Sequence, residues 1–386
     1  GVIEAPALRP DGTVIHADGY DPATGLYLVS APNLRVPPIP EKPTPTDVVS
    51  AAGVLLNLVS DFPFSDKSSL ANIIALMLTP VMRPAIASPA PLALIDAPQA
   101  GTGKSLLSEV VSIIATGREA AVITAPTTDD EWQKRITSLL LTGATVISVD
   151  NVELPLNAPS LAAALTATTW TDRRLGRNDD VLVMPQRATW LATGNNLRLR
   201  GDLPRRCYWV RLDAQSSRPW QRVAFQFPEL KAHVAKVRGE LLAALLTIAR
   251  AWFVAGQPEP DGVLRLGSFE RWCTAIGGAL QTAGISGFLG NAEELYEISD
   301  EEAEEWEAFL RVWHDAIGDR PVTAASIADV AFRPDTESYF GPLAEVFPAA
   351  CVDANGVVNV RKLGKALSAK ADARFGPDGL HVVKVR

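Results

Sequence analysis

The sequence is poor in the residues that build disulfides and metal sites. Its 386 residues include only three cysteines and four histidines, and these do not show the short spacing of a metal-binding motif. The chain has no run of 18 uninterrupted apolar residues, and its first residues lack the basic-then-apolar pattern of a signal peptide. These absences argue against a membrane span and against a secreted disulfide scaffold. They favour a reducing, cytoplasmic setting.

The chain also lacks the positive charge of a protein that coats nucleic acid. Its formal net charge is −8, with 47% hydrophobic and 21% charged residues, which is an ordinary globular composition. The charge is segregated, however. Residues 170–211 carry nine arginines and four aspartates, whereas residues 293–307 carry nine acidic residues. A local basic groove is therefore compatible with the acidic total.

Changes in composition and periodicity predict five segments in a chain long enough for two or three domains. These are an N-terminal hairpin with a proline-rich linker (1–45), a helical lead-in (46–87), an α/β core (88–215), a helical domain (216–318) and a winged-helix-like module (319–386). Thr46 or Asp47 is expected to cap a helix that ends near Asn57. The last module is inferred from two predicted helices and a hairpin around 377–379. Because the sequence begins with Gly1, we expect it to be part of a longer protein.

Four short apolar runs define the core segment. The runs alternate with helical patterns, and they are LALIDA, AAVITA, ATVISVD and ATWLATG. Continuous apolar runs are typical of strands that are buried on both faces. This alternation therefore predicts an α/β fold with a mostly parallel sheet flanked by helices.

One stretch matches the phosphate-binding pattern G-x-x-x-x-G-K-[ST] except at its first position, where proline replaces glycine. The expected nucleotide-binding residues are Pro98, Gln99, Ala100, Gly101, Thr102, Gly103, Lys104, Ser105 and Leu106. The two glycines allow backbone amides to surround phosphates, Lys104 can reach the β- and γ-phosphates, and Ser105 can bind Mg²⁺. A strand precedes the stretch and an amphipathic helix follows it. This context favours a site for ATP and Mg²⁺ over a glycine-rich turn that binds nothing.

An acidic residue is expected on a neighbouring strand. Asp150 ends the run ATVISVD and is the predicted Mg²⁺ ligand. The next residue is normally an acid that polarises the attacking water, but here it is Asn151, whose amide cannot accept a proton. Hydrolysis is therefore slow, or another carboxylate serves. Glu131, which follows the run AAVITA, is the favoured candidate and Glu153 is the second, although either could equally be a helix cap or a surface acid.

The fourth run leads into polar residues that could complete the site. Asn195 and Asn196 compete to place an amide beside the γ-phosphate or the attacking water. Arg205 and Arg206 follow a short turn, from which an arginine could reach the γ-phosphate of a neighbouring subunit. A guanidinium there would stabilise the charge that develops in phosphoryl transfer. The alternative is a salt-bridged surface pair.

Two groups of basic residues are candidates for DNA contacts. Arg173, Arg174 and Arg177 lie around a turn that could hold the phosphates of a strand, unless they form ion pairs with nearby aspartates. A second group recurs along one predicted helix near the C-terminus, where a solvated face or a protein contact is the alternative. It consists of Arg361, Lys362, Lys365 and Lys370.

Four motifs in this order and spacing resemble the AAA+ ATPase core of superfamily 3-type helicases. They are APQAGTGKS, VISVDN, WLATGNN and GDLPRR. Within that group the chain is most similar to the helicase part of phage, plasmid and prophage primase–helicase proteins. The lead-in RPDGTVIHADGYDPATGLYL and the later LGSFERWCTAIGGALQTAGISGFLGN also resemble that group, so the similarity covers most of the chain.

The resemblance implies an ATP-driven DNA helicase or translocase for mobile-element replication. It implies a ring, usually a hexamer, around single-stranded or forked DNA, with ATP between subunits and no membrane. It assigns Walker A to Lys104 and Ser105, Walker B to Asp150, sensor 1 to Asn195 or Asn196, and the arginine finger to Arg205 or Arg206. A primase would be a preceding domain or a separate protein. Two alternatives are a slow-turnover AAA+ switch and a winged-helix DNA-binding replication initiator with a weak ATPase.

Overall fold

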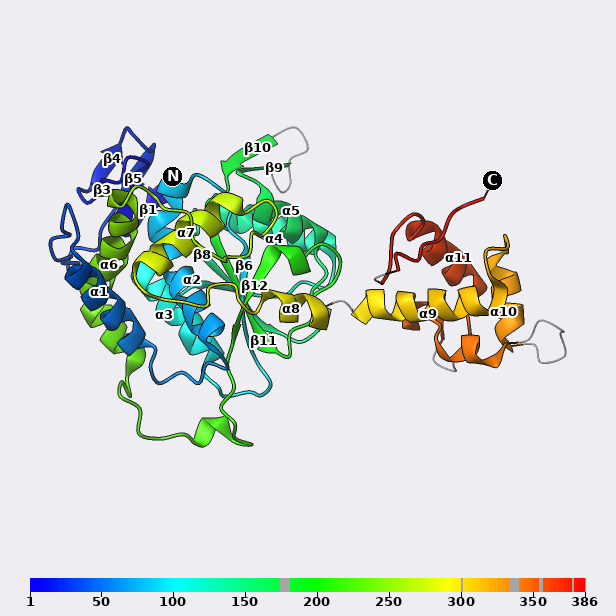
Figure 1. Ribbon diagram of the computed structural model, residues 1–386. Coiled ribbons are helices and arrows are strands. Elements are labelled where there is room, and N and C mark those ends of the chain that lie inside the picture. The colour runs from blue at the N-terminus through cyan, green and yellow to red at the C-terminus, as the bar shows by residue number, and fades with distance from the viewer. Residues whose placement is uncertain (174–180, 300, 333–339, 354–356, 377, 386) are drawn as a thin grey trace. The chain divides into compact units, whose positions relative to one another are not determined.

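The computed structural model describes residues 1–173, 181–299, 301–332, 340–353, 357–376 and 378–385. These residues form two compact units, Gly1–Tyr296 and Glu297–Arg386 (Figure 1). Each unit has its own hydrophobic core. The predicted site residues of the α/β core all belong to the first unit.

A five-stranded parallel sheet forms the centre of the first unit, as the alternating apolar runs predict (Figure 1). Its order is β12-β6-β11-β8-β7. The strands are β6 (Leu92–Ala97), β7 (Ala121–Thr124), β8 (Val146–Val152), β11 (Thr189–Asn195) and β12 (Cys207–Arg211). Every residue of β6 is buried, which explains its uninterrupted apolar pattern. The edge strand β12 was not expected from the sequence.

Helices surround this sheet. They are α1 (Pro45–Leu58), α2 (Lys67–Ile86), α3 (Lys104–Thr116), α4 (Asp129–Leu141), α5 (Pro159–Thr166), α6 (Leu230–Val254), α7 (Glu270–Thr282) and α8 (Ala292–Ser299). Helix α3 contacts β6, β8 and β11, and α2 contacts β12. By length and composition α2 could cross a membrane, but 78% of its most apolar window is buried inside the protein. It is accordingly a core helix of this fold.

The N-terminal region forms two small sheets, ordered β1-β5-β4 and β2-β3. Their strands are β1 (Val2–Ile3), β2 (Ala7–Leu8), β3 (Val14–Ile15), β4 (Gly19–Asp21) and β5 (Leu26–Leu28). Helix α1 begins earlier than expected, because Thr44 and not Thr46 or Asp47 is its N-cap. Pro45 fits the first helical position, where no backbone donor is needed, and Asp47 completes a capping box with Thr44.

An antiparallel hairpin separates α5 from β11. It consists of β9 (Thr169–Arg173) and β10 (Val181–Pro185), paired from Val181–Arg173 to Pro185–Thr169. The sequence predicted a turn in this region but not the two strands. The hairpin carries Arg173 at the end of β9.

The second unit contains α9 (Glu301–Ile317), α10 (Ala324–Phe332) and α11 (Val360–Ala369). Phe309, Leu343 and Leu363 are fully buried in its core. The expected helical domain 216–318 is therefore divided, since α6 and α7 pack in the first unit and α9 packs in the second. Across the turn expected at 377–379, Phe375 and Leu380 form an antiparallel bridge, and Ala371 and Val382 form a parallel one.

Candidate functional site

The loop between β6 and α3 has the backbone of a phosphate cradle. Lys104 is the first residue of α3, and Gly103 is its N-cap. Gly101 and Gly103 have φ values of 79° and 97°, which side chains with a Cβ rarely adopt. The free N–H groups at the start of α3 can therefore turn toward an anion. Pro98 begins the loop directly after Ala97, the last residue of buried β6.

Lys104 faces the end of the neighbouring strand β11. Its Nζ donates hydrogen bonds to Asn195 Oδ1 at 2.7 Å and to Gln99 O at 3.2 Å. Burial lowers the pKa of Lys104, while Asp96 and Asp150 oppose that shift. Asn195 is thus the amide side chain that meets the lysine. Asn196 instead has a left-handed φ of 48°, and its backbone N–H donates to Ala97 O at 3.1 Å.

Ser105, the second residue of α3, meets Asp150 of β8. Ser105 Oγ donates to Asp150 Oδ1 at 3.0 Å, and Thr193 Oγ1 donates to the same oxygen at 2.5 Å. Their oxygens suit Mg²⁺, which commonly takes one or two protein ligands and keeps water or phosphate oxygens for the rest. The side chains present at the loop therefore fit a nucleotide with its metal.

Asn151 lies at an irregularity in β8. The pairing of β8 with β11 shifts register between Ala192 and Gly194, and Asn151 has a left-handed φ of 51°. Its backbone N–H donates to Thr193 Oγ1 at 3.0 Å, and its Nδ2 donates to Glu153 Oε1 at 2.8 Å. The β-bulge thus aims the Asn151 amide at Glu153.

Glu131, the other candidate base, is exposed in the first turn of α4. Its Oε1 accepts a hydrogen bond from Lys134 Nζ at 3.0 Å on the same helix. The strand before it, β7, pairs with β8 so that Thr124 lies opposite Asp150. Glu131 and Glu153 thus both follow strands that end at the site. Of the two, Glu153 accepts a hydrogen bond from Asn151, the residue after Asp150.

A buried aspartate lies under the loop, and sequence reasoning missed it. Asp96 is fully buried in β6, where its Oδ1 accepts from Leu197 N at 3.0 Å and its Oδ2 lies 3.6 Å from Arg211 Nη1. Burial raises the pKa of Asp96. The Arg211 guanidinium also lies 4.5 Å from the centre of the Trp209 ring. These contacts join the ends of β6, β11 and β12 beneath the phosphate loop. In the sequence, the signal for this residue is the acidic side chain within the apolar run LALIDA.

The two arginines after Asp202 have different surroundings. Arg206 donates to Ala162 O and to Thr166 Oγ1 on α5, and only 14% of its side chain is exposed. Both arginines pair with Asp202, but 61% of the Arg205 side chain is exposed. The hydrogen bond from Arg205 also lowers the pKa of Asp202. Arg206 therefore anchors the turn, while Arg205 is available to a neighbouring molecule.

The predicted DNA-binding residues are partly described. Arg173 is exposed at the end of β9, whereas Arg174 and Arg177 lie outside the described residues. In the second unit, α11 exposes three of its predicted basic side chains and buries Leu363 on the opposite side. These are Arg361, Lys362 and Lys365.

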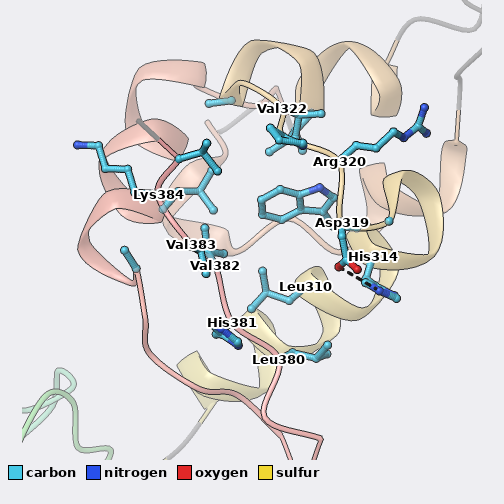
Figure 2. A pocket seen from close by; sticks show the side chains of 18 of the residues that line it. Leu310, His314, Asp319, Arg320, Val322, Leu380, His381, Val382, Val383 and Lys384 are labelled. Atoms are coloured by element: carbon cyan, nitrogen blue, oxygen red, sulfur yellow. Dashed lines mark ion pairs between the residues drawn. The ribbon is translucent and has the colours of Figure 1, made fainter.

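A large cavity belongs to the second unit and contains no residue of the phosphate loop. Its volume is about 990 Å³, and Figure 2 shows Leu310, Val322 and Val382 among the side chains that line it. His314 and Asp319 form an ion pair at 3.6 Å on its wall. Mixed apolar and charged walls do not select one ligand class, so this cavity does not identify a ligand.

The fold and site together define a P-loop α/β core. No protein-family model matches the sequence, and no curated protein matches it significantly. Among solved structures, the chain is similar to the apo C-terminal region of NrS-1, with 13% identity and a TM-score of 0.44 over 84% of this chain and 69% of that one. A second structure of that region has 13% identity to this chain and a TM-score of 0.43, and the match covers 96% of this chain and 85% of that one. JCV helicase bound to a small acetamide has 14% identity and a TM-score of 0.26, and the match covers 65% of this chain and 73% of that one. Since these TM-scores are below 0.5, the description of the core depends on its strand order and site geometry.

Proposed function

We propose that this chain is an ATP-dependent DNA helicase or translocase that acts as a ring in the replication of a mobile element. The observation that carries the proposal is the group of side chains around the phosphate loop. Lys104 meets Asn195, and Ser105 meets Asp150, at the carboxyl ends of three adjacent parallel strands. Phosphoryl transfer needs such positioning and charge stabilisation more than it needs covalent chemistry. The four sequence motifs resemble those of superfamily 3-type helicases, and this resemblance is the reason for proposing that ATP hydrolysis is coupled to movement on DNA.

Each side chain has a distinct role in this proposal. Lys104 neutralises the β- and γ-phosphates, Ser105 and Asp150 hold Mg²⁺, and Asn195 orients the γ-phosphate or the attacking water. Mg²⁺ would supply charge neutralisation on the phosphate oxygens. Arg205 would reach the nucleotide of the adjacent subunit, while Arg206 holds the turn against α5.

We expect the base to be Glu153, with Glu131 as the alternative. Asn151 occupies the usual acid position and its amide binds Glu153, so a carboxylate lies one hydrogen bond from that position. Glu153→Gln keeps the size of the side chain but removes the proton acceptor. Single-turnover hydrolysis should fall by about 10²-fold while ATP binding survives. If Glu131→Gln causes the larger loss, the base is Glu131 and the Asn151–Glu153 contact is structural.

Arg173 should contribute to DNA binding through a phosphate contact. Arg173→Ala should weaken binding of single-stranded DNA of any sequence and reduce the magnitude of the salt slope by about one. Arg271→Ala is a matched control, since Arg271 is exposed on α7. Fluorescence anisotropy at several salt concentrations measures both quantities. Equal effects of the two substitutions would show that the β9–β10 hairpin is not part of the DNA-binding surface.

Two alternatives to the helicase function can be tested with the wild-type protein. Asn151 favours a slow ATP switch, in which the ring closes on ATP but turnover stays near zero. The separate core of the second unit, with its basic α11, favours a DNA-binding initiator with a winged-helix-like module. Mass measurement with and without ATP and single-stranded DNA should show assembly into a ring, expected to be a hexamer. A chain that stays monomeric and binds DNA only through residues 319–386 would support the initiator.

A further inference from the structure

An exposed segment with apolar side chains passes beside the phosphate loop. Residues 213–227 form most of the connection between β12 and α6 and include a short 3-10 helix, Pro219–Gln221. Three large apolar side chains on this segment are exposed: Trp220 by 61%, Val223 by 84% and Phe225 by 41%. Apolar groups that gather on one exposed segment are common at binding sites.

The segment is fixed to the connection between α1 and α2. Asp61 Oδ2 accepts from Gln226 N at 2.8 Å, and Asp61 O accepts from Arg222 Nη2 at 2.9 Å. At the start of the segment, Asp213 N donates to Pro63 O at 2.7 Å. These bonds lie on both sides of Trp220, so the position of its backbone is set by the fold.

Two aromatic side chains flank the phosphate loop. A Cβ added to Gly101 would lie 3.0 Å from Trp220 Cβ and 3.3 Å from Trp220 Cε3. A Cβ added to Gly103 would lie 3.0 Å from Phe62 Cε1. Phe62 is buried, so it supports the loop from inside, whereas Trp220 touches the loop and remains open to solvent.

We propose that Trp220 is the stacking platform for the base of the bound nucleotide. The inference rests on the proposed function, in which the loop holds the phosphates. A nucleotide anchored there extends its uncharged ribose and base away from the loop amides, over the adjacent surface. The exposed indole in contact with Gly101 is a flat apolar group within that surface. Stacking on an aromatic ring is tolerant of base identity, because every base has a π-face. Trp220 therefore supplies affinity for nucleoside triphosphates and little discrimination among their bases.

The test compares ATP with inorganic tripolyphosphate, which has no base. Trp220→Ala should weaken ATP binding by about five- to a hundredfold and leave tripolyphosphate binding unchanged. Trp220→Phe should restore most of the ATP affinity. Val223→Ala is the matched control, and it should change neither affinity. Calorimetry or competition against a fluorescent nucleotide measures each dissociation constant.

Two results would overturn the stacking role. They are an unchanged ATP affinity in Trp220→Ala, and an equal loss for ATP and tripolyphosphate, which would mean that the substitution disturbs the loop itself. Failure of the proposed function has a different signature. In that case Lys104→Ala would bind ATP and tripolyphosphate as the wild type does, whatever happens at Trp220.

Discussion

Replacing Lys104 by alanine should abolish ATP hydrolysis while the protein stays folded. The ammonium group of Lys104 donates a hydrogen bond to Asn195 at 2.7 Å. It lies at the start of α3, where the phosphates of the nucleotide would bind. Its removal takes away charge stabilisation that no other side chain of the loop supplies. We expect turnover to fall by at least about 10³-fold.

The control for this experiment is a second lysine at the start of a helix. Lys67 is exposed and is the first residue of α2, as Lys104 is of α3. Lys67→Ala should keep the wild-type rate, and both variants should keep the wild-type circular dichroism spectrum and melting temperature. ATP turnover that survives in Lys104→Ala would show that the loop is not the site of hydrolysis.

Replacing Arg205 by alanine should also remove activity, by roughly 10³-fold, but through the neighbouring subunit. Arg205 is exposed, and its ion-pair partner Asp202 lies on the same turn, so the guanidinium can exchange this pairing for a phosphate. A subunit lacking Lys104 still offers Arg205, and a subunit lacking Arg205 still offers Lys104. Mixing the two inactive variants should therefore restore part of the turnover, since some interfaces contain both residues.

The mixing experiment requires proof that mixed assemblies form. Two affinity tags, one on each variant, allow their co-purification. Rescue in these mixed assemblies would establish action between subunits. Mixed assemblies that stay inactive would place Arg205 outside the neighbouring active site, and its pair with Asp202 would then be a surface ion pair worth little.

The local parts of the site could be predicted from the sequence. The spacing of Gly101, Gly103 and Lys104 is a short-range pattern, and the flanking strand and helix follow from hydrophobic periodicity. The parallel sheet was predicted for the same reason. Its edge strand β12 was missed because five residues between charged loops do not distinguish a strand from a helix, and contact with α2 decides the outcome.

Contacts between distant strands could not be predicted. The choice of Asn195 over Asn196 depends on the left-handed backbone at Asn196, which a sequence does not show. The position of Asp96 between Leu197 and Arg211 requires the strand order. The exposure difference between Arg205 and Arg206 depends on α5, which the pattern of two adjacent arginines does not reveal.

Unwinding of a forked DNA by the wild type and by Lys104→Ala tests the central claim most directly. The measurement follows strand separation by fluorescence, with ATP, without ATP and with a non-hydrolysable analogue. The proposed function predicts unwinding by the wild type only when ATP can be hydrolysed, and none by the variant. Wild-type assemblies that bind ATP and forked DNA but never separate the strands or move along them would contradict it.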